Sequence, residues 1–278
     1  MSEKAISQST RRKLLKDTTV LVSGGLLGGA AATYSTQPAA KTETVGAEPP
    51  PLPWEWPTNI DPLEAGRQAY QNYFKGGCGH GAYSALLGLL QEKVGYPWTT
   101  MPKRMMVHAA AGYGGHGTLC GALGGTSLLL NLLVYKDGDK TFQQMVDRLY
   151  HWYSNQEFPT NKFDDISKIP NQIKVQAGTP LCHTSVTRWM HAANASVTSQ
   201  EKLERCAKVT GEIVYVTTKA LNEYFAGEWT PPTAWKPSDE IRHCVACHSP
   251  DDTFHTSTSR DSQQGRMECV LCHDDHTK

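Results

Sequence analysis

Apolar residues recur every three or four positions along most of the chain between Asp61 and Gly227. This spacing places apolar side chains on one face of an α-helix and is the main sequence signal for an amphipathic helix. No segment alternates apolar and polar residues in the way that a half-buried strand does. We therefore predict an all-α fold, a helical bundle with helices over residues 61–74, 79–93, 118–135, 139–153, 184–193 and 198–225.

Residues with strong capping or breaking preferences mark the predicted helix ends. Asp61 followed by Pro62 is typical of a helix start, with Asp as the N-cap and Pro at the first helical position. The pair Gly76-Gly77 should end the first helix, and Gly227 should end the last. The segment Thr198-Ser-Gln-Glu201 has the spacing of a capping box that begins at Thr198.

Proline-rich stretches divide the chain into parts with different composition. The linker before the bundle carries Trp54 and Trp56, which should dock onto the folded body. The segment after Pro237 is polar and has too few apolar residues for a core, so we expect bound cofactors to supply its hydrophobic mass. The predicted parts are a signal and processing region (1–47), a Pro-rich linker (48–60), a helical domain (61–230) and a small loop-rich tail (231–278).

The first residues have the pattern of an export signal. Arg11-Arg12 precedes a weakly apolar run from Val20 to Ala32, and small residues follow at Ala40 and Ala47. Paired arginines before such a run are typical of the twin-arginine route. That route carries folded proteins, so we expect a periplasmic protein whose helical domain receives a cofactor or partner before export. Beyond this region no apolar run has membrane-spanning length.

The charge of the chain limits its partners. Lysine and arginine number 27, aspartate and glutamate also number 27, and the formal net charge is zero. No basic tract follows the N-terminal region, so nothing indicates a nucleic-acid partner.

Two copies of Cys-x-x-Cys-His lie near the end of the chain, at residues 244–248 and 269–273. This motif is the attachment signature of c-type haem. Its two thiols bond the porphyrin, and the histidine that follows becomes an axial ligand of the iron. The sequence therefore predicts two haem c groups per chain, held by Cys244, Cys247, Cys269 and Cys272, with His248 and His273 on the irons.

Each iron then needs a sixth ligand or has an open site. Three further histidines crowd the tail: His243, His255 and His276. His276 is too close to His273 in sequence to reach the far face of the same haem, so it would serve the other haem or one in a second subunit. His255 lies between the motifs with enough slack to cross over, and we favour it.

The tail cysteines leave two alternatives to haem open. Two Cys-x-x-Cys pairs at this separation also resemble a zinc ribbon, and disulfides are the ordinary state of cysteines in an oxidising compartment. The histidine after each pair, which a four-cysteine zinc site does not need, favours haem.

Four cysteines lie outside these motifs: Cys78, Cys120, Cys182 and Cys206. The first three should lie at helix N-termini, where unpaired N–H groups and the helix dipole stabilise a thiolate. Cys120 also follows a glycine-rich loop, 112–117, whose amides could hydrogen-bond to cluster sulfides. An iron–sulfur site, disulfides and simple buried thiols are the alternatives.

Segments around these cysteines resemble a redox-active family described by a C-G-C-A-x-x-G-C-C pattern. The resemblance rests on residues 77–85, 111–125, 180–189 and 204–207. With the two-haem tail attached, the chain from about Asp61 to Lys278 resembles split-Soret cytochrome c. The resemblance implies a helical homodimer with four haems gathered at one end, bis-His ligation with one histidine crossing from the partner subunit, and an iron–sulfur site in the helical part, held by Cys120, Cys182, Cys206 and Cys78.

These patterns together predict an electron carrier with unidentified redox donor and acceptor, and no catalytic residues of its own. One alternative is an oxidoreductase that uses a five-coordinate haem or the iron–sulfur centre on a small inorganic substrate. Another is an interaction module stabilised by zinc or disulfides.

Overall fold

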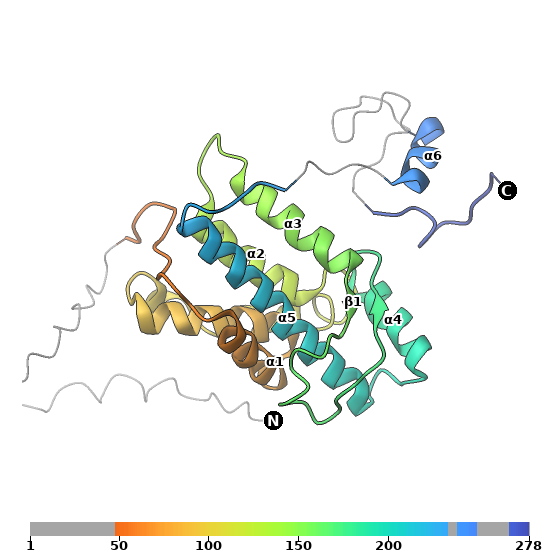
Figure 1. Cartoon of the computed structure of the whole chain (residues 1–278), viewed down its shortest axis with the longest axis horizontal. Coiled ribbons are helices and arrows are strands. Elements are labelled where there is room, and N and C mark those ends of the chain that lie inside the picture. The colour runs from red at the N-terminus through yellow and green to blue at the C-terminus, as the bar shows by residue number, and fades with distance from the viewer. Residues whose placement is uncertain (1–47, 233–237, 249–266, 278) are drawn as a thin grey trace, which may run out of the picture. The chain divides into compact units, whose positions relative to one another are not determined.

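The computed structural model describes residues 48–232, 238–248 and 267–277 (Figure 1). The predicted export signal and His255 lie outside these residues, and the domain boundaries stay a prediction. The described residues are mostly helical, which confirms the predicted all-α fold class. None of the helices in these three segments is long and apolar enough to cross a membrane. The helices are α1 (Pro62–Lys93), α2 (Gly121–Val134), α3 (Thr141–Asn155), α4 (Cys182–Ala193), α5 (Gln200–Phe225) and α6 (Asp239–His248), with 3-10 turns at Trp98–Thr100 and Val107–Ala109.

Helix α1 is kinked where the sequence predicts a break. It begins as expected, with the carboxylate of Asp61 accepting a 2.9 Å hydrogen bond from the amide of Leu63 and Pro62 at the first position. Gly76 and Gly77 have non-helical backbone angles, and Gly77 has φ of +81°. A side chain is disfavoured there, since a Cβ on Gly77 would also approach Cβ of Ala110 to 2.7 Å. The two predicted helices are therefore the two halves of α1.

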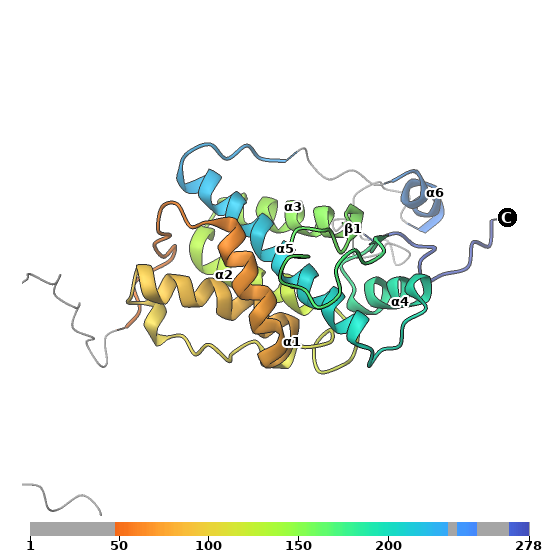
Figure 2. The same ribbon diagram turned by 60° about the horizontal axis from the view of Figure 1, so that its bottom comes forward.

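Helix α5 packs against α1, and the two run side by side in Figure 2. Glycines allow this close approach. A Cβ on Gly66 would lie 2.9 Å from the carbonyl oxygen of Gly211, and a Cβ on Gly211 would lie 2.8 Å from that of Gly66. The ring of Phe163, which is fully buried, covers both glycines.

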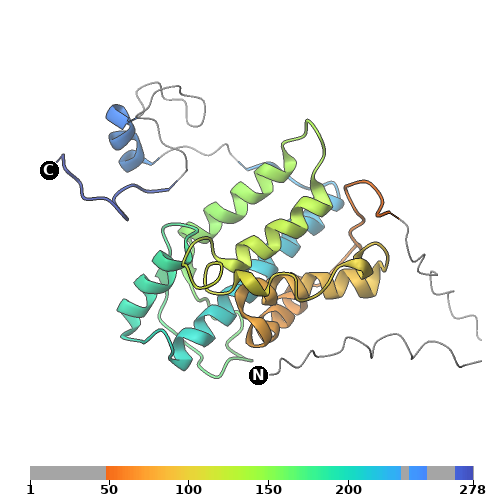
Figure 3. The ribbon, with the colours of Figure 1, turned by 180° about the vertical axis from the view of Figure 1, so that it is seen from behind.

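Helix α2 packs against α1 and α3, as the view from behind shows (Figure 3). Its leucines and those of the second half of α1 form the centre of the core. Burial of one such side chain contributes about 1.5–3 kcal/mol. The fully buried members are Leu86, Leu87 and Leu90 of α1 and Leu123, Leu129 and Leu133 of α2.

The starts of α2, α3, α4 and α5 differ from the prediction by one to three residues. Helix α3 begins at Thr141 and not at residue 139, and helix α4 begins at Cys182 and not at residue 184. The N-cap of α5 is Ser199, whose hydroxyl accepts a 3.2 Å hydrogen bond from the amide of Lys202, and not Thr198. Both residue types cap helices well, so the sequence could not choose between them. Helix α2 begins at Gly121 with Cys120 as its N-cap, and not at Thr118. The amide of Cys120 instead donates to Pro180, outside the helix.

The predicted docking of the two tryptophans is confirmed. Trp54 and Trp56 are buried, with 7% and 4% of their surface exposed. The amide of Trp54 donates to the carbonyl of Leu132 at 2.8 Å, and the indole of Trp56 donates to Asn222 at 3.0 Å. The linker thus closes over one end of the bundle.

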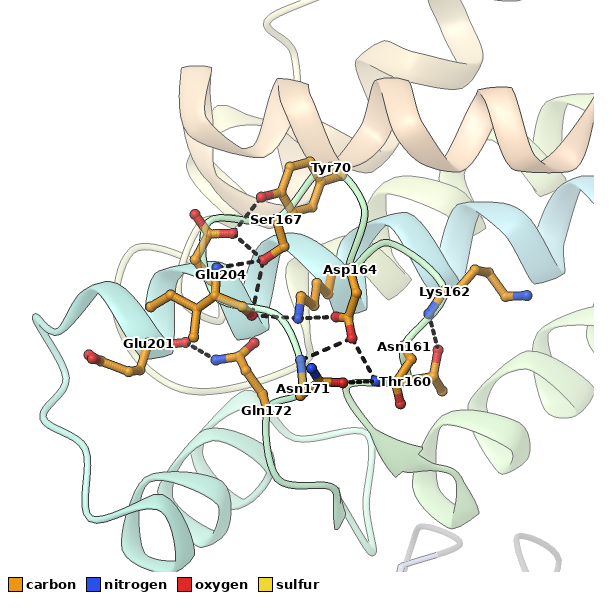
Figure 4. A network of polar contacts seen from close by, with 12 residues as sticks. Tyr70, Thr160, Asn161, Lys162, Asp164, Ser167, Asn171, Gln172, Glu201 and Glu204 are labelled. Atoms are coloured by element: carbon orange, nitrogen blue, oxygen red, sulfur yellow. Dashed lines mark hydrogen bonds and ion pairs between the residues drawn. The ribbon is translucent and has the colours of Figure 1, made fainter.

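One small sheet was not predicted. Strands β1 (Glu157–Phe158) and β2 (Val175–Gln176) pair in antiparallel fashion. With two residues each, they are too short to show an alternating pattern. The loop between them is held to α5 by polar contacts (Figure 4).

This polar network joins buried charges to partners on the loop and on α1. The carboxylate of Glu204 accepts hydrogen bonds from Tyr70 and, at 2.8 Å, from Ser167. The ammonium group of Lys208, fully buried, pairs with Asp164 at 2.5 Å and donates to the carbonyl of Ile169 at 2.7 Å. Each buried charge is therefore satisfied, which fixes the first half of α5 in place.

Candidate functional site

The two Cys-x-x-Cys-His motifs are each folded locally, the first at the end of helix α6 and the second in a turn. Cys247 and His248 follow Cys244 by three and four residues on α6, so the three side chains share a face of the helix. In the second motif, the amides of Cys272 and His273 both donate to the carbonyl of Cys269, at 3.1 and 3.0 Å. Each motif thus gathers its two thiols and its imidazole locally.

Both motifs line one cavity of about 340 Å³. This volume is in the range of about 300–1,000 Å³ found for small-molecule and cofactor sites. The first cysteines of the two motifs, Cys244 and Cys269, are neighbours in this cavity, where burial and the thiol of Cys269 raise the pKa of Cys244. The cavity is lined by His243, Cys244, Cys247, His248, Cys269, Val270, His273, Asp274, Asp275, His276 and Thr277.

The described candidates for the sixth iron ligand, His243 and His276, lie at this cavity. The ring centroid of His276 is 5.9 Å from that of His248, in an edge-to-face arrangement. Nε2 of His243 lies 2.9 Å from the hydroxyl of Thr277. His276 therefore lies beside the first Cys-x-x-Cys-His motif rather than its own, in agreement with one of the two predicted arrangements, whereas His255 lies outside the described residues.

The remaining cysteines form what we call the four-cysteine site: Cys78, Cys120, Cys182 and Cys206. Four elements supply them, because Cys78 follows the kink of α1, Cys120 caps α2, Cys182 opens α4 and Cys206 lies in the second turn of α5. All eight cysteines of the chain lie in the described segments, and none of them forms a disulfide there.

A short backbone bridge holds Cys120 and Cys182 together. The amide of Cys120 donates to Pro180 at 2.9 Å, and the amide of Cys182 donates to Thr118 at 2.6 Å. Leu119 and Leu181 pair between them as an isolated antiparallel bridge. The starts of α2 and α4 are thereby joined at the site.

Cys78 and Cys120 are the most closely coupled pair. The thiol of Cys78 hydrogen-bonds to Cys120, which lowers the pKa of Cys120 and, together with burial, raises the pKa of Cys78. The amide of Ala122 in the first turn of α2 also stabilises the Cys120 thiolate. Cys120 is therefore the site's preferred thiolate, as its place at a helix start predicts.

The prediction that a helix start stabilises the thiolate is wrong for Cys182 and Cys78. Burial, followed by the charges of Cys78 and Cys206, raises the pKa of Cys182 to about 12 although it opens α4. Cys78 follows a kink rather than a free helix start, and its pKa is raised. Burial at Cys182, and the hydrogen bond to Cys120 together with burial at Cys78, outweigh the helix dipole.

Groups that the sequence did not single out surround Cys206 and Cys120. The guanidinium of Arg205 lies 3.9 Å from Sγ of Cys206. The side chain of Tyr73 interacts with Cys206 and Cys78, and Tyr153 with Cys120. Arg205 directly precedes Cys206, and Tyr73 lies five residues before Cys78. This closeness to a cysteine is the only sequence signal that the two residues carry.

The glycine-rich loop does not present its amides as expected. Residues 111–115 and Gly117 have positive φ, so the loop curls in the left-handed region. The amides of residues 113–118 all donate to carbonyls between residues 108 and 113. These six amides are therefore engaged within the loop and do not face a ligand.

The four thiols do not surround a single point. Among the described residues, no three His, Cys, Asp or Glu side chains are arranged to hold one metal ion. Thiolate sulfur is nevertheless the donor that iron–sulfur centres use. In a two-iron centre, each iron takes only two protein ligands, so a group of three around one ion is not required.

The chain is similar to known proteins in both sequence and structure. Residues 83–220 match the family model "Putative redox-active protein (C_GCAxxG_C_C)". The split-Soret cytochrome c of Desulfovibrio desulfuricans (strain ATCC 27774 / DSM 6949 / MB) is 29% identical over 261 residues, which cover 91% of this chain and 89% of that protein. The chain is thus a helical redox protein. It is a homologue of split-Soret cytochrome c.

A solved structure agrees with this conclusion. It is described as "A novel iron centre in the split-Soret cytochrome c from Desulfovibrio desulfuricans ATCC 27774". The TM-score is 0.66 at 28% identity, and the match covers 79% of this chain and 90% of the other. The resemblance inferred from the cysteine segments is confirmed.

Proposed function

We propose that the protein is a periplasmic electron carrier with two haem c groups in its tail and an iron–sulfur centre at the four-cysteine site. The observation that carries the haem part is the shared cavity lined by both Cys-x-x-Cys-His motifs. The spacing of each motif on one turn matches the attachment of a single porphyrin.

The residues of the tail fit this cofactor chemically. Cys244 and Cys247 would bond one haem, and Cys269 and Cys272 the other, with His248 and His273 as axial ligands. His276, beside His248, is the described histidine best placed to complete a six-coordinate iron. Haem iron with two histidines changes oxidation state without an open site, at lower potential than iron with Met and His ligands.

The iron–sulfur centre rests on the donor set and on the relative. The four thiols are buried or half-buried and influence one another electrostatically. The split-Soret relative has an iron centre by its description. Cysteine ligation of iron at this site would give the bundle its own one-electron group, apart from the haems.

Export and partners complete the proposal. The twin-arginine pattern at Arg11-Arg12 supports a periplasmic location, and assembly of the iron–sulfur centre in the cytoplasm would explain the use of a route for folded proteins. The resemblance to split-Soret cytochrome c supports a homodimer in which a histidine crosses between subunits. The redox donor and acceptor would be other periplasmic proteins.

One spectroscopic experiment tests the function. The purified mature protein should show a Soret band, two haems per chain by pyridine haemochrome assay, and iron with acid-labile sulfide in excess of haem. EPR of the reduced protein should show the iron–sulfur signal. A colourless protein would contradict the haem assignment and favour the zinc or disulfide module.

Carbon monoxide separates the carrier from an enzyme. Six-coordinate haem with two histidines should bind CO poorly, so the reduced spectrum should barely change. A full CO spectrum from one haem would instead indicate an open iron and the alternative of an oxidoreductase acting on a small inorganic substrate.

A further inference from the structure

Arg205 is a cation buried inside the bundle, with 2% of its surface exposed. Its Nη2 donates to the hydroxyl of Ser185 at 2.7 Å and to the carbonyl of Ser185 at 3.3 Å. Its Nη1 faces Sγ of Cys206 at 3.9 Å. Nε has no hydrogen-bond partner among the described residues.

No carboxylate in the described segments forms an ion pair with Arg205. The acidic residues that follow or precede it on α5, and Asp164 of the loop between β1 and β2, are engaged elsewhere. Glu204 accepts from Tyr70 and Ser167, and Asp164 pairs with Lys208. Glu212, two turns further along α5, accepts from the amide of Thr160 at 2.8 Å through Oε1. Burial raises the pKa of Glu212 to about 7, the charge of Arg205 lowers it only slightly, and the two side chains form no ion pair.

A buried cation without a counter-ion is costly. Removing a charge from water costs several kcal/mol even after the protein relaxes, and only a close anion and good hydrogen bonds offset that cost. Lys208 shows the usual solution one turn away, because Asp164 neutralises it. Arg205 must therefore meet its negative charge in another group.

The groups that face Arg205 are those of the four-cysteine site. Nη1 of Arg205 lies 3.9 Å from Sγ of Cys206, and Tyr153 and Cys120 are the next groups that interact electrostatically with the guanidinium. The hydroxyl of Tyr153 donates to Ser185 at 2.8 Å, so Ser185 links Tyr153 to the guanidinium. Arg205 is thus oriented toward the cysteines by a neutral hydrogen-bond partner.

We propose that Arg205 is the counter-cation of a net-negative iron–sulfur centre at the four-cysteine site, and that it raises the reduction potential of that centre. The proposal rests on the iron–sulfur part of the proposed function. Reduction adds one electron, supplied by the redox donor, and breaks no bond. A fixed positive charge stabilises the more negative, reduced state more than the oxidised state. Arg205 is a positioning residue, since it acts through the cysteine ligands.

The first test compares Arg205→Met with Arg205→Lys in the full mature protein, by EPR-monitored redox titration with dithionite. R205M should lower the reduction potential of the iron–sulfur centre by about 59 mV. At a fixed applied potential, this shift changes the ratio of reduced to oxidised centre tenfold. R205K keeps the charge and should retain most of the wild-type value. The haem potentials serve as an internal reference and should move less.

A matched control is Lys208→Met, which removes the neighbouring buried cation of α5. Because Lys208 is already neutralised by Asp164, K208M should lower stability but leave the potential of the centre unchanged. An equal shift in K208M and R205M would overturn the proposal, since any loss of buried charge would then have the same effect.

The second test measures stability and does not depend on the potential. After the iron–sulfur centre has been removed by chelation, Arg205 is left without an anion. R205M should then be at least as stable to urea as the wild type, whereas in the loaded protein R205M should be less stable. If R205M lowers stability equally with and without the centre, its role is packing alone and the proposal is wrong.

The two proposals fail in distinguishable ways. Wild-type protein with haem but no further iron or sulfide would contradict the iron–sulfur site, and with it the role of Arg205. A wild-type centre whose potential is the same in R205M would contradict only the role of Arg205.

Discussion

The amide of Cys182 donates a 2.6 Å hydrogen bond to the carbonyl of Thr118, two residues before Cys120. Two cysteines that are 62 positions apart (182 minus 120) are thereby held by backbone alone. Their separation does not depend on side-chain packing, so it should persist when the other cysteines are changed. This rigidity would suit the proposed iron–sulfur centre, which has to keep its geometry between two oxidation states.

Cysteine substitutions should separate the two kinds of cofactor. Cys120→Ser should abolish acid-labile sulfide and the iron in excess of haem, because Cys120 is the site's preferred thiolate and serine is a poor ligand for iron–sulfur centres. The haem content should stay at two per chain, since the motifs at 244–248 and 269–273 are untouched. Iron, sulfide and pyridine haemochrome assays on one preparation check both statements. Unchanged sulfide in C120S would remove Cys120 from the site.

Gly121 should tolerate no side chain. A Cβ at this position would overlap the carbonyl oxygen of Ala109 and approach Sγ of Cys78 to 2.9 Å. Gly121→Ala should therefore cost roughly 1–3 kcal/mol of unfolding free energy, as overpacking usually does, and reduce incorporation of the iron–sulfur centre.

The matched control is Gly88→Ala in the second half of α1. A Cβ there would meet only Nζ of Lys103, at 3.9 Å. Because alanine is the better helix former, G88A should raise stability by about 0.5–1 kcal/mol. Urea denaturation of both variants gives the comparison, and destabilisation of similar size in the two would contradict the steric argument.

Glu212 should make stability depend on pH. Burial is the main cause that raises the pKa of this carboxyl to about 7. Because the folded state binds the proton more tightly than the unfolded state, its contribution to stability is complete below about pH 4.5 and is lost as the pH rises through 7. A shift of this size corresponds to about 3 kcal/mol.

The variant Glu212→Gln should remove this part of the pH dependence, so that wild type loses stability relative to E212Q between about pH 4.5 and about pH 7.5. Urea denaturation across this range measures it. Glu92→Gln, at an exposed carboxyl of α1, reports what the loss of a surface charge does on its own. If the free energy of unfolding depended on pH in the same way in wild type and E212Q, the prediction would be wrong, because folding would then not raise the pKa of Glu212.

The start of α5 can be tested by two neighbouring changes. Ser199→Ala should cost about 1 kcal/mol of stability, because it removes the hydroxyl that accepts from the amide of Lys202. Thr198→Ala should cost less, since Thr198 lies outside the cap. Thermal denaturation of the two variants measures both losses of stability. A larger loss in T198A than in S199A would indicate that Thr198 is the N-cap, as the sequence predicted.

Local signals were sufficient for much of the fold. Asp61-Pro62 and the glycine pair at 76–77 act through their own backbone preferences, so the start and the kink of α1 could be predicted from sequence. The choice between Thr198 and Ser199 could not, because both can cap. The strands at 157–158 and 175–176 could not either, because they depend on pairing across a loop.

The candidate sites divide in the same way. The haem motifs are local, and their spacing alone identifies the thiols and imidazoles. The approach of the four scattered cysteines depends on contacts between α1, α2, α4 and α5, which only the resemblance to a known family could suggest. The burial of Arg205 follows from the packing of α5 and has no signal in the sequence, where charged residues surround it.

The kink at Gly76-Gly77 uncouples the two halves of α1 in rotation. In a straight helix, one inserted residue turns everything beyond it by about 100°. Here the chain restarts its helix at Cys78, so an insertion or deletion before Gly76 leaves the direction of Cys78 toward the site unchanged. The rotation of Cys78 is therefore independent of the helical register of the first half of α1, which is set instead by the contacts of Gly66 with Gly211 and of Tyr70 with Glu204.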